Sequence, residues 1–216
     1  LANVSGLRNI AIGANAYDAS DTESDNIAIG YNAMTTNTAG GEKNLAIGNY
    51  ALDALTDGDN NIAIGYEAGT SITEGIGNTT VGHTALRLAT TENYNTAFGF
   101  GALAGNINGG ASNTAIGVWA QTQLTTGSKN TSLGYTAGYM HSTGDRNTCL
   151  GYEAGRIIQQ GDNNICIGNE AGENITHGSN NVVIGEAEVP SATGDDQLSI
   201  SSGDGGVTWF TGNSTG

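Results

Sequence analysis

The sequence predicts an all-β protein built as a parallel β-roll, a solenoid of eleven stacked coils. A pattern of asparagine, one variable residue, one small residue, one large apolar residue and glycine begins eleven times, at intervals of 17 or 18 residues. A period kept over most of a chain is typical of a solenoid. The pattern is rich in β-branched residues and ends at glycine, as a short strand before a turn does. The repeated asparagines are Asn9, Asn26, Asn44, Asn61, Asn78, Asn95, Asn113, Asn130, Asn147, Asn164 and Asn181.

Composition excludes two classes of partner. The chain has 216 residues, with 6 basic against 21 acidic side chains and a formal net charge of −15. Nucleic-acid binding requires a basic surface, which this balance does not supply. No apolar run approaches the roughly 18 residues that a membrane span needs. We therefore expect neither a nucleic-acid partner nor insertion into a membrane.

The three residues after each asparagine are expected to form the strand of a coil. Alternate strand residues face opposite sides. The first and third residues share one face, and the third is always large and apolar, as in Ile12, Phe98 and Leu150. The second residue is small in most copies, as in Ala28 and Ser132, and lies on the other face. We expect both faces to be buried, with the large column supplying the core of each chain.

Turns and a return segment complete each predicted coil. The glycine after each strand, from Gly13 to Gly185, is expected to take a positive φ and reverse the chain. An alanine stands seven residues after the asparagine in ten copies, and a second short strand is expected through that column. Another glycine stands three residues before the asparagine in nine copies, among Asp, Asn and Ser, which is turn chemistry. The asparagines themselves are expected to form a ladder, bonded to each other and to the turns.

The period stops near residue 189, so we divide the chain into a β-roll domain over 1–189 and a second segment over 190–216. Pro190 interrupts the repeat. Residues 197–200 and 207–210 then have the pattern of two strands around a glycine-rich turn at 203–206. This segment is predicted to be a β-hairpin that caps the roll, or the start of a following module.

The repeat unit resembles that of two families of surface fibre. The sequence Asn-Thr-Ala-Ile-Gly at 113–117, and the Ala-Gly pairs at 137–138 and 154–155, resemble repeats of bacteriophage tail fibres and of the YadA-like trimeric autotransporter adhesin head. The resemblance covers about residues 6–189. It implies a left-handed parallel β-roll, three chains around a threefold axis, and a role in adhesion or receptor binding. A single coil of this length is also a thin roll, so we expect one face to pack on other copies of the chain.

The function predicted from these features is structural and adhesive rather than enzymatic. We expect a segment of an extracellular homotrimeric fibre, a phage tail fibre or similar virion appendage, that presents loops to a receptor on the host surface. A glycan is one candidate for that receptor. The alternative is the head domain of a trimeric adhesin on a bacterial cell surface. A further alternative is a single-chain solenoid, such as an ice-binding protein using the Thr79–Thr148 column or a glycan-degrading protein. We expect those threonines to line the core or bond to the backbone.

No catalytic residue, cofactor or metal site is predicted. Cys149 and Cys166 fall in the same small column of neighbouring coils and are expected to be buried free thiols. The three histidines stand at different offsets and are expected to form no ligand cluster. Glu153 and Glu170 share one offset in neighbouring coils, the only arrangement suggestive of a glycosidase pair, and are expected to lie on a solvated edge. The acidic turn residues Asp57, Asp59, Asp162 and Asp204 lack the calcium-repeat pattern.

An aromatic stripe is the one candidate ligand surface. Aromatic residues follow the conserved glycine in several coils, and stacking of the coils would align them. If exposed, such a stripe binds sugars; the alternative is that the rings pack as a ladder under the turn. The residues are Tyr31, Tyr66, Phe100, Trp119, Tyr135 and Tyr152.

Overall fold

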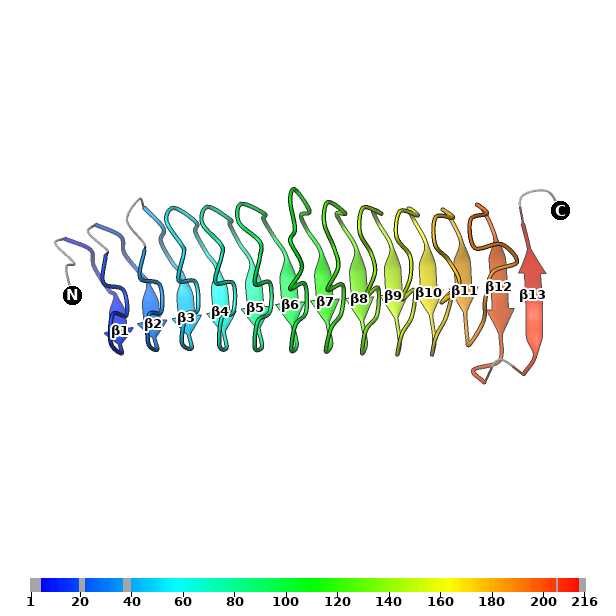
Figure 1. The fold of residues 1–216 in the computed structure, drawn as a ribbon, viewed down its shortest axis with the longest axis horizontal. Helices are drawn as coiled ribbons and strands as arrows, with labels where there is room; N and C mark the ends of the chain where they lie inside the picture. The colour runs from blue at the N-terminus through cyan, green and yellow to red at the C-terminus, as the bar shows by residue number, and fades with distance from the viewer. Residues whose placement is uncertain (1–4, 20–21, 37–39, 205, 214–216) are drawn as a thin grey trace.

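The computed structural model describes residues 5–19, 22–36, 40–204 and 206–213, which form one elongated stack of coils (Figure 1). Its thirteen strands form one sheet in chain order, and the described residues contain no helix. The predicted all-β parallel solenoid of about eleven turns is confirmed. The strands are β1 (Ile10–Ile12), β2 (Ile27–Ile29), β3 (Leu45–Ile47), β4 (Ile62–Ile64), β5 (Thr79–Val81), β6 (Thr96–Phe98), β7 (Thr114–Ile116), β8 (Thr131–Leu133), β9 (Thr148–Leu150), β10 (Ile165–Ile167), β11 (Val182–Ile184), β12 (Leu198–Ser201) and β13 (Thr208–Gly212).

The parallel register turns each column of the sequence into a column in space. Ile62 pairs with Thr79 and Ile64 with Val81, so residues at one offset from the asparagine lie side by side. The register also holds across an 18-residue step, where Thr96 pairs with Thr114. The extra residue of that coil therefore lies outside the strand.

The predicted asparagine ladder is present, and it is buried from Asn26 to Asn181. The Oδ1 atom of each asparagine accepts the backbone N–H of the next asparagine, at 2.8 to 3.0 Å from Asn9 to Asn181. The Nδ2 atom donates to a turn carbonyl, as Asn61 does to the oxygen of Gly75 at 2.7 Å. Gln197 continues the ladder, because its N–H donates to Oδ1 of Asn181 at 2.9 Å. Each amide thus joins the end of its own coil to the coils beside it.

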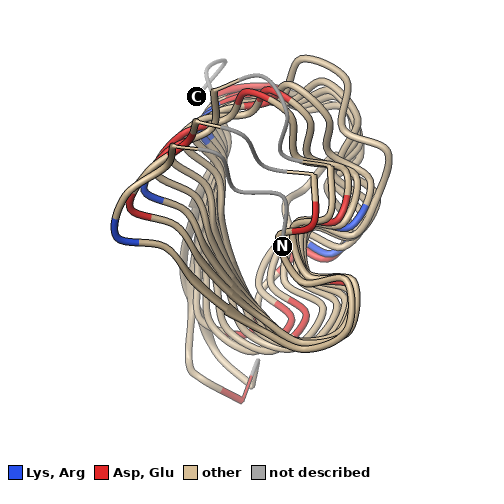
Figure 2. Cartoon of the chain, turned by 90° about the vertical axis from the view of Figure 1, so that its left-hand side faces the viewer, with Lys and Arg blue, Asp and Glu red and all other residues tan. Residues whose placement is uncertain are grey.

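A second side-chain ladder runs two residues before the asparagines. Oδ1 of Asp59 accepts the N–H of Glu42 at 2.8 Å, and Oδ1 of Asp162 accepts the N–H of Asp145 at 2.8 Å. These carboxylates pair backbone donors of the preceding coil, as predicted for turn residues. Figure 2, which looks along the stack, shows the charged residues gathered at the bends of the coil.

The interior lies on the opposite face of the strand from the one predicted. The small column is fully buried from Ala28 to Val183, whereas Ile12, Phe98 and Leu133 of the large column are 58%, 53% and 45% exposed. The prediction that the large column forms the core of each chain is therefore wrong. The threonine column shares the outward face, so the expectation that it lines the core is wrong as well, while its other expected role, bonding to the backbone, stays a prediction.

The return segment fills the interior instead. After the alanine, two positions of the coil carry large side chains that point inward and lie beside the small column. They are Tyr17, Met34, Leu52, Leu86 and Leu103 at eight residues after the asparagine, and Leu55, Ile72, Leu124, His141, Ile158 and Ile175 at eleven.

The predicted second strand is wrong, because the alanine column lies between two left-handed residues. Asn32 and Met34, on either side of Ala33, both have a φ of 52°. Their N–H groups donate to Ala14 and Ala51 of the preceding and following coils, at 3.1 and 3.0 Å. The segment is thus bonded to both neighbours without β geometry, and it turns the chain sharply.

The C-terminal strands pair in two ways. β12 lies parallel to β11, with Leu198 beside Val182, and β13 lies antiparallel to β12, with Gly212 beside Leu198. The predicted antiparallel pair is therefore present, while its role as a cap and the domain boundary at residue 189 stay predictions. Residues 1–4 and 214–216, at the outer limits of the two predicted domains, and Gly205 of the predicted turn lie outside the described residues.

The glycine after each strand is fixed by the close stacking of the coils. Gly82 has a φ of +136°, and a Cβ atom there would lie 2.4 Å from the carbonyl oxygen of Gly99. An L-residue would be strained in this conformation and would also push the next coil away. Both constraints recur along the glycine column, so glycine occupies this position in every copy.

We expect Gly82→Ala to lower the free energy of unfolding by about 2–5 kcal/mol, because it combines overpacking with backbone strain. Gly203→Ala is the control, since a Cβ atom there meets nothing within 4 Å. Chemical denaturation of both variants and of the parent protein measures the difference. Equal stability of Gly82→Ala and the parent would show that the coils are not packed this closely.

Candidate functional site

The first and third residues of strands β1 to β12 form one continuous apolar surface, which we call the outer sheet face. It carries a large apolar residue in every coil and no charged residue. The backbone of these strands is already paired in the sheet, so the surface can make contacts only through its side chains. Its most exposed large apolar members are Ile10, Ile12, Ile62, Ile64, Phe98, Ile116, Leu133, Leu150, Ile165, Ile184 and Leu198.

The structure joins the predicted aromatic stripe into a longer row. Six rings follow one another with centroids 4.8 to 5.9 Å apart, and we call them the aromatic row: Tyr31, Tyr50, Tyr66, His83, Phe100 and Trp119. Tyr135 and Tyr152 form a separate stacked pair at 5.4 Å. Every predicted member therefore contacts another ring.

Tyr50 and His83 were missing from the predicted stripe. His83 stands at the same offset as Tyr66 and Phe100, but its ring was not counted as aromatic. Tyr50 stands one residue later, as Trp119 does, and its ring still reaches the same row. Counting imidazole as a ring and allowing both offsets would have found them.

The rings lie at the surface rather than under the turn. Tyr31, Tyr66 and Phe100 are between 42% and 44% exposed, and Trp119 is half-buried. A hydrogen bond to Glu67 and the charge of that carboxylate raise the pKa of Tyr66. The hydroxyl therefore donates its proton to Glu67, and its oxygen can still accept a hydrogen bond from a ligand.

The interior holds a small polar cluster at β9 and β10. Cys149 and Cys166 are free, buried and in register, as predicted. A hydrogen bond to Cys166, together with burial, raises the pKa of the Cys149 thiol, so it is a poor nucleophile. Nε2 of His141 lies 3.6 Å from Sγ of Cys149. Within the described part of the chain, no three His, Cys, Asp or Glu side chains are placed to hold a metal ion.

His141 joins this cluster because its offset, eleven residues after the asparagine, points inward. Sequence reasoning missed the contact, although the same offset carries Ile158 and Ile175 in the following coils. Burial lowers the pKa of His141 to about 4, and Nδ1 has no hydrogen-bond partner. The imidazole is therefore neutral in the folded protein.

We expect folding stability to fall as the pH drops from 6.5 to about 4. Over this range the unfolded chain gains a proton on His141, whereas the folded chain does not. The loss attributable to this group reaches about 3 kcal/mol. His141→Ile should remove this part of the pH dependence, while the exposed His177→Asn should leave it unchanged. Denaturation at pH 7 and 4.5 tests this, and an unchanged slope in His141→Ile would contradict it.

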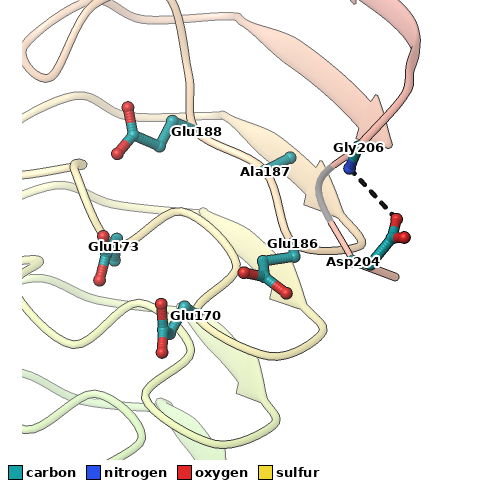
Figure 3. A pocket seen from close by; sticks show the side chains of 7 residues that line it. All are labelled: Glu170, Glu173, Glu186, Ala187, Glu188, Asp204 and Gly206. Atoms are coloured by element: carbon teal, nitrogen blue, oxygen red, sulfur yellow. Dashed lines mark hydrogen bonds between the residues drawn. The ribbon is translucent and has the colours of Figure 1, made fainter. Parts of the chain in front are cut away.

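An acidic pocket of about 340 Å³ lies beside the last coils (Figure 3). Glu153 and Glu170, which share one offset, have different surroundings. Glu153 forms an ion pair with Arg156 at 2.9 Å, whereas Glu170 faces the pocket. Among the carboxylates around Glu170, Asp204 lies outside the predicted roll and Glu188 stands where other coils have alanine, so column reasoning did not find them. The pocket is lined by Glu170, Glu173, Glu186, Ala187, Glu188, Asp204 and Gly206.

Burial, and then the charge of Glu170, raise the pKa of Glu173. A raised folded-state pKa means that the ionised carboxylate destabilises the fold above that pKa. We expect Glu173→Gln to increase the free energy of unfolding at pH 7 by less than about 1 kcal/mol, with no gain below pH 4. Denaturation at the two pH values measures this. A loss of stability at pH 7 would mean that the carboxylate has a stabilising partner.

A comparison with protein-family models gives no match, and comparisons with curated proteins and with solved structures give none either. The described residues also include no helix that could cross a membrane. Any function must therefore be argued from the outer sheet face and the aromatic row.

Proposed function

We propose that the chain is a structural and adhesive segment of a homotrimeric fibre, in which the outer sheet faces of three copies pack around a common axis. The single observation that carries this proposal is the outer sheet face. Soluble monomers rarely expose contiguous apolar patches larger than a few hundred Å². Here exposed large apolar side chains lie on the same surface in nine of the strands β1 to β12. A second and third copy would remove these side chains from water.

The number of copies comes from the resemblance to trimeric fibre repeats. Strands about 4.8 Å apart make a rod about 50 Å long, and one side of it carries a large apolar residue on every strand from β1 to β12. Such a rod is stiff, and its bends carry polar and acidic residues that keep the outside in water. We favour a phage tail fibre or similar virion appendage that contacts a receptor on its host. The head of a bacterial surface adhesin is the alternative, with the same assembly.

A second candidate function follows from the threonine column. Thr79, Thr96, Thr114, Thr131 and Thr148 lie in register on the outer sheet face, on consecutive strands. A flat, regular row of threonine is the surface that a single-chain ice-binding solenoid would use. The two functions differ in assembly, because ice binding leaves this face open in a monomer.

We expect a solution mass of about 65 kDa by light scattering, three times the 21.8 kDa of one chain. Ile116→Asp should yield the 21.8 kDa monomer, because it would bury a charge in the contact between copies. Thr126→Asp, at an exposed turn, should keep the larger mass. A wild-type protein that stays monomeric would contradict the trimer, and inhibition of ice growth would then be the next measurement.

A further inference from the structure

We propose that the aromatic row binds one extended chain of a neutral polysaccharide along the axis of the roll, with the indole of Trp119 as its stacking surface. This inference rests on the proposed adhesive function and names the class of ligand. It depends on the orientation of the rings and on the glycine beneath Trp119.

The middle of the row cannot stack on a ligand, because its rings cover each other. Tyr66 and His83 lie 5.1 Å apart at an interplanar angle of 18°, and His83 and Phe100 lie 5.0 Å apart at 11°. Stacked rings offer only their edges to solvent. The tyrosine hydroxyls and the imidazole nitrogens are therefore suited to hydrogen bonds rather than to contact with the flat face of a sugar.

Trp119 is turned out of this stack. Its ring stands at 76° to Phe100, with the centroids 4.8 Å apart. A Cβ atom on Gly101 would lie 2.5 Å from both Cε3 and Cζ3 of the indole. The indole therefore lies against the backbone of Gly101 and is partly exposed to solvent.

Glycine is required at residue 101 because of the neighbouring indole and not because of its own backbone conformation. Its φ is 64°, but Asn32, Glu67 and Glu153 have φ values of 51° to 52° at the same offset in other coils. Side chains are thus accepted at this left-handed position. The glycine is needed at residue 101 because any Cβ atom there would displace Trp119, which indicates that the indole is held in this place.

The chemistry of the row selects a neutral sugar chain. Pyranose rings stack their C–H faces on indole and direct their hydroxyls sideways, toward groups such as those of Tyr66 and His83. The rings repeat every 4.8 to 5.9 Å, close to the length of one sugar unit in an extended chain. The chain carries a net charge of −15, and Arg87, the cation beside the row, is paired with Glu67 at 3.8 Å, which disfavours an anionic polysaccharide.

The test uses the emission of Trp119 as the reporter. The chain has two tryptophans, so Trp209→Phe leaves Trp119 as the only one. This protein is titrated with cellohexaose, maltohexaose and mannohexaose, and with hexagalacturonate as the anionic comparison. We expect at least one of the neutral hexasaccharides to shift the emission and hexagalacturonate to leave it unchanged.

Variants in the otherwise native chain separate the row from other exposed aromatics. By calorimetry, Trp119→Ala should weaken binding of that hexasaccharide by about tenfold. Gly101→Asn should weaken it similarly while keeping Trp119, because it moves the indole. Tyr94→Ala is the matched control and should bind like the parent: Tyr94 is 64% exposed and its ring lies within 2.9 Å of a Cβ atom on Gly77, but it is outside the row.

The proposal is overturned if no neutral hexasaccharide binds, if hexagalacturonate binds more tightly, or if Trp119→Ala and Tyr94→Ala weaken binding equally. It is also overturned if Trp119→Ala lowers the solution mass, because the row would then be a contact between copies. The row lies within one chain, so the titration is informative for a monomer or a trimer. Failure of the trimer appears in the mass of the parent protein, and failure of the ligand appears in the titration.

Discussion

The buried asparagine amide is the interaction on which the rest of the roll depends. Its Oδ1 holds the first N–H of the next coil, and its Nδ2 holds a turn carbonyl at the end of its own coil. If the asparagine stood at another position of the repeat, these buried polar groups would be left unpaired, which costs about 1–3 kcal/mol for each group. The strict period follows from this. Gln197, one methylene longer, continues the ladder after a step of 16 residues and still reaches the oxygen of Gly194 at 2.7 Å.

The sequence predicted the features that the ladder enforces, and it did not show which strand face is inside. The alternation of side chains along a three-residue strand shows which residues share a face, but it does not show which face points into the interior. The orientation depends on the return segment, where Met34 and Leu52 point inward with left-handed φ values of 52° and 49°. Bulky residues rarely adopt that conformation, so their sequence suggested a strand instead. The sequence also did not show that a glycine of the return segment makes room for a larger residue of the small column. Gly155 does so for Cys149, because a Cβ atom on Gly155 would lie 2.4 Å from Sγ of Cys149.

The candidate surfaces follow from this orientation. Once the small column and the return segment fill the interior, the large column must face outward, and a single chain leaves it in water. The aromatic row was largely predictable, because it depends only on equal offsets in stacked coils. The turn of Trp119 away from Phe100 was not, because it depends on Gly101 in the coil before it. The acidic pocket was also beyond column reasoning, since Asp204 lies after the last repeat and Glu188 stands where other coils have alanine.

The central claim is that the outer sheet face is buried between copies of the chain, and the reactivity of a cysteine placed there tests it directly. Ile116→Cys and Thr126→Cys are compared in their rate of reaction with a maleimide, with both natural cysteines buried in the interior. The account predicts that Ile116→Cys reacts far more slowly than Thr126→Cys in the native protein and equally fast after denaturation. Equal rates in the native protein would show that the face is open to solvent, and the assembly proposed here would be wrong.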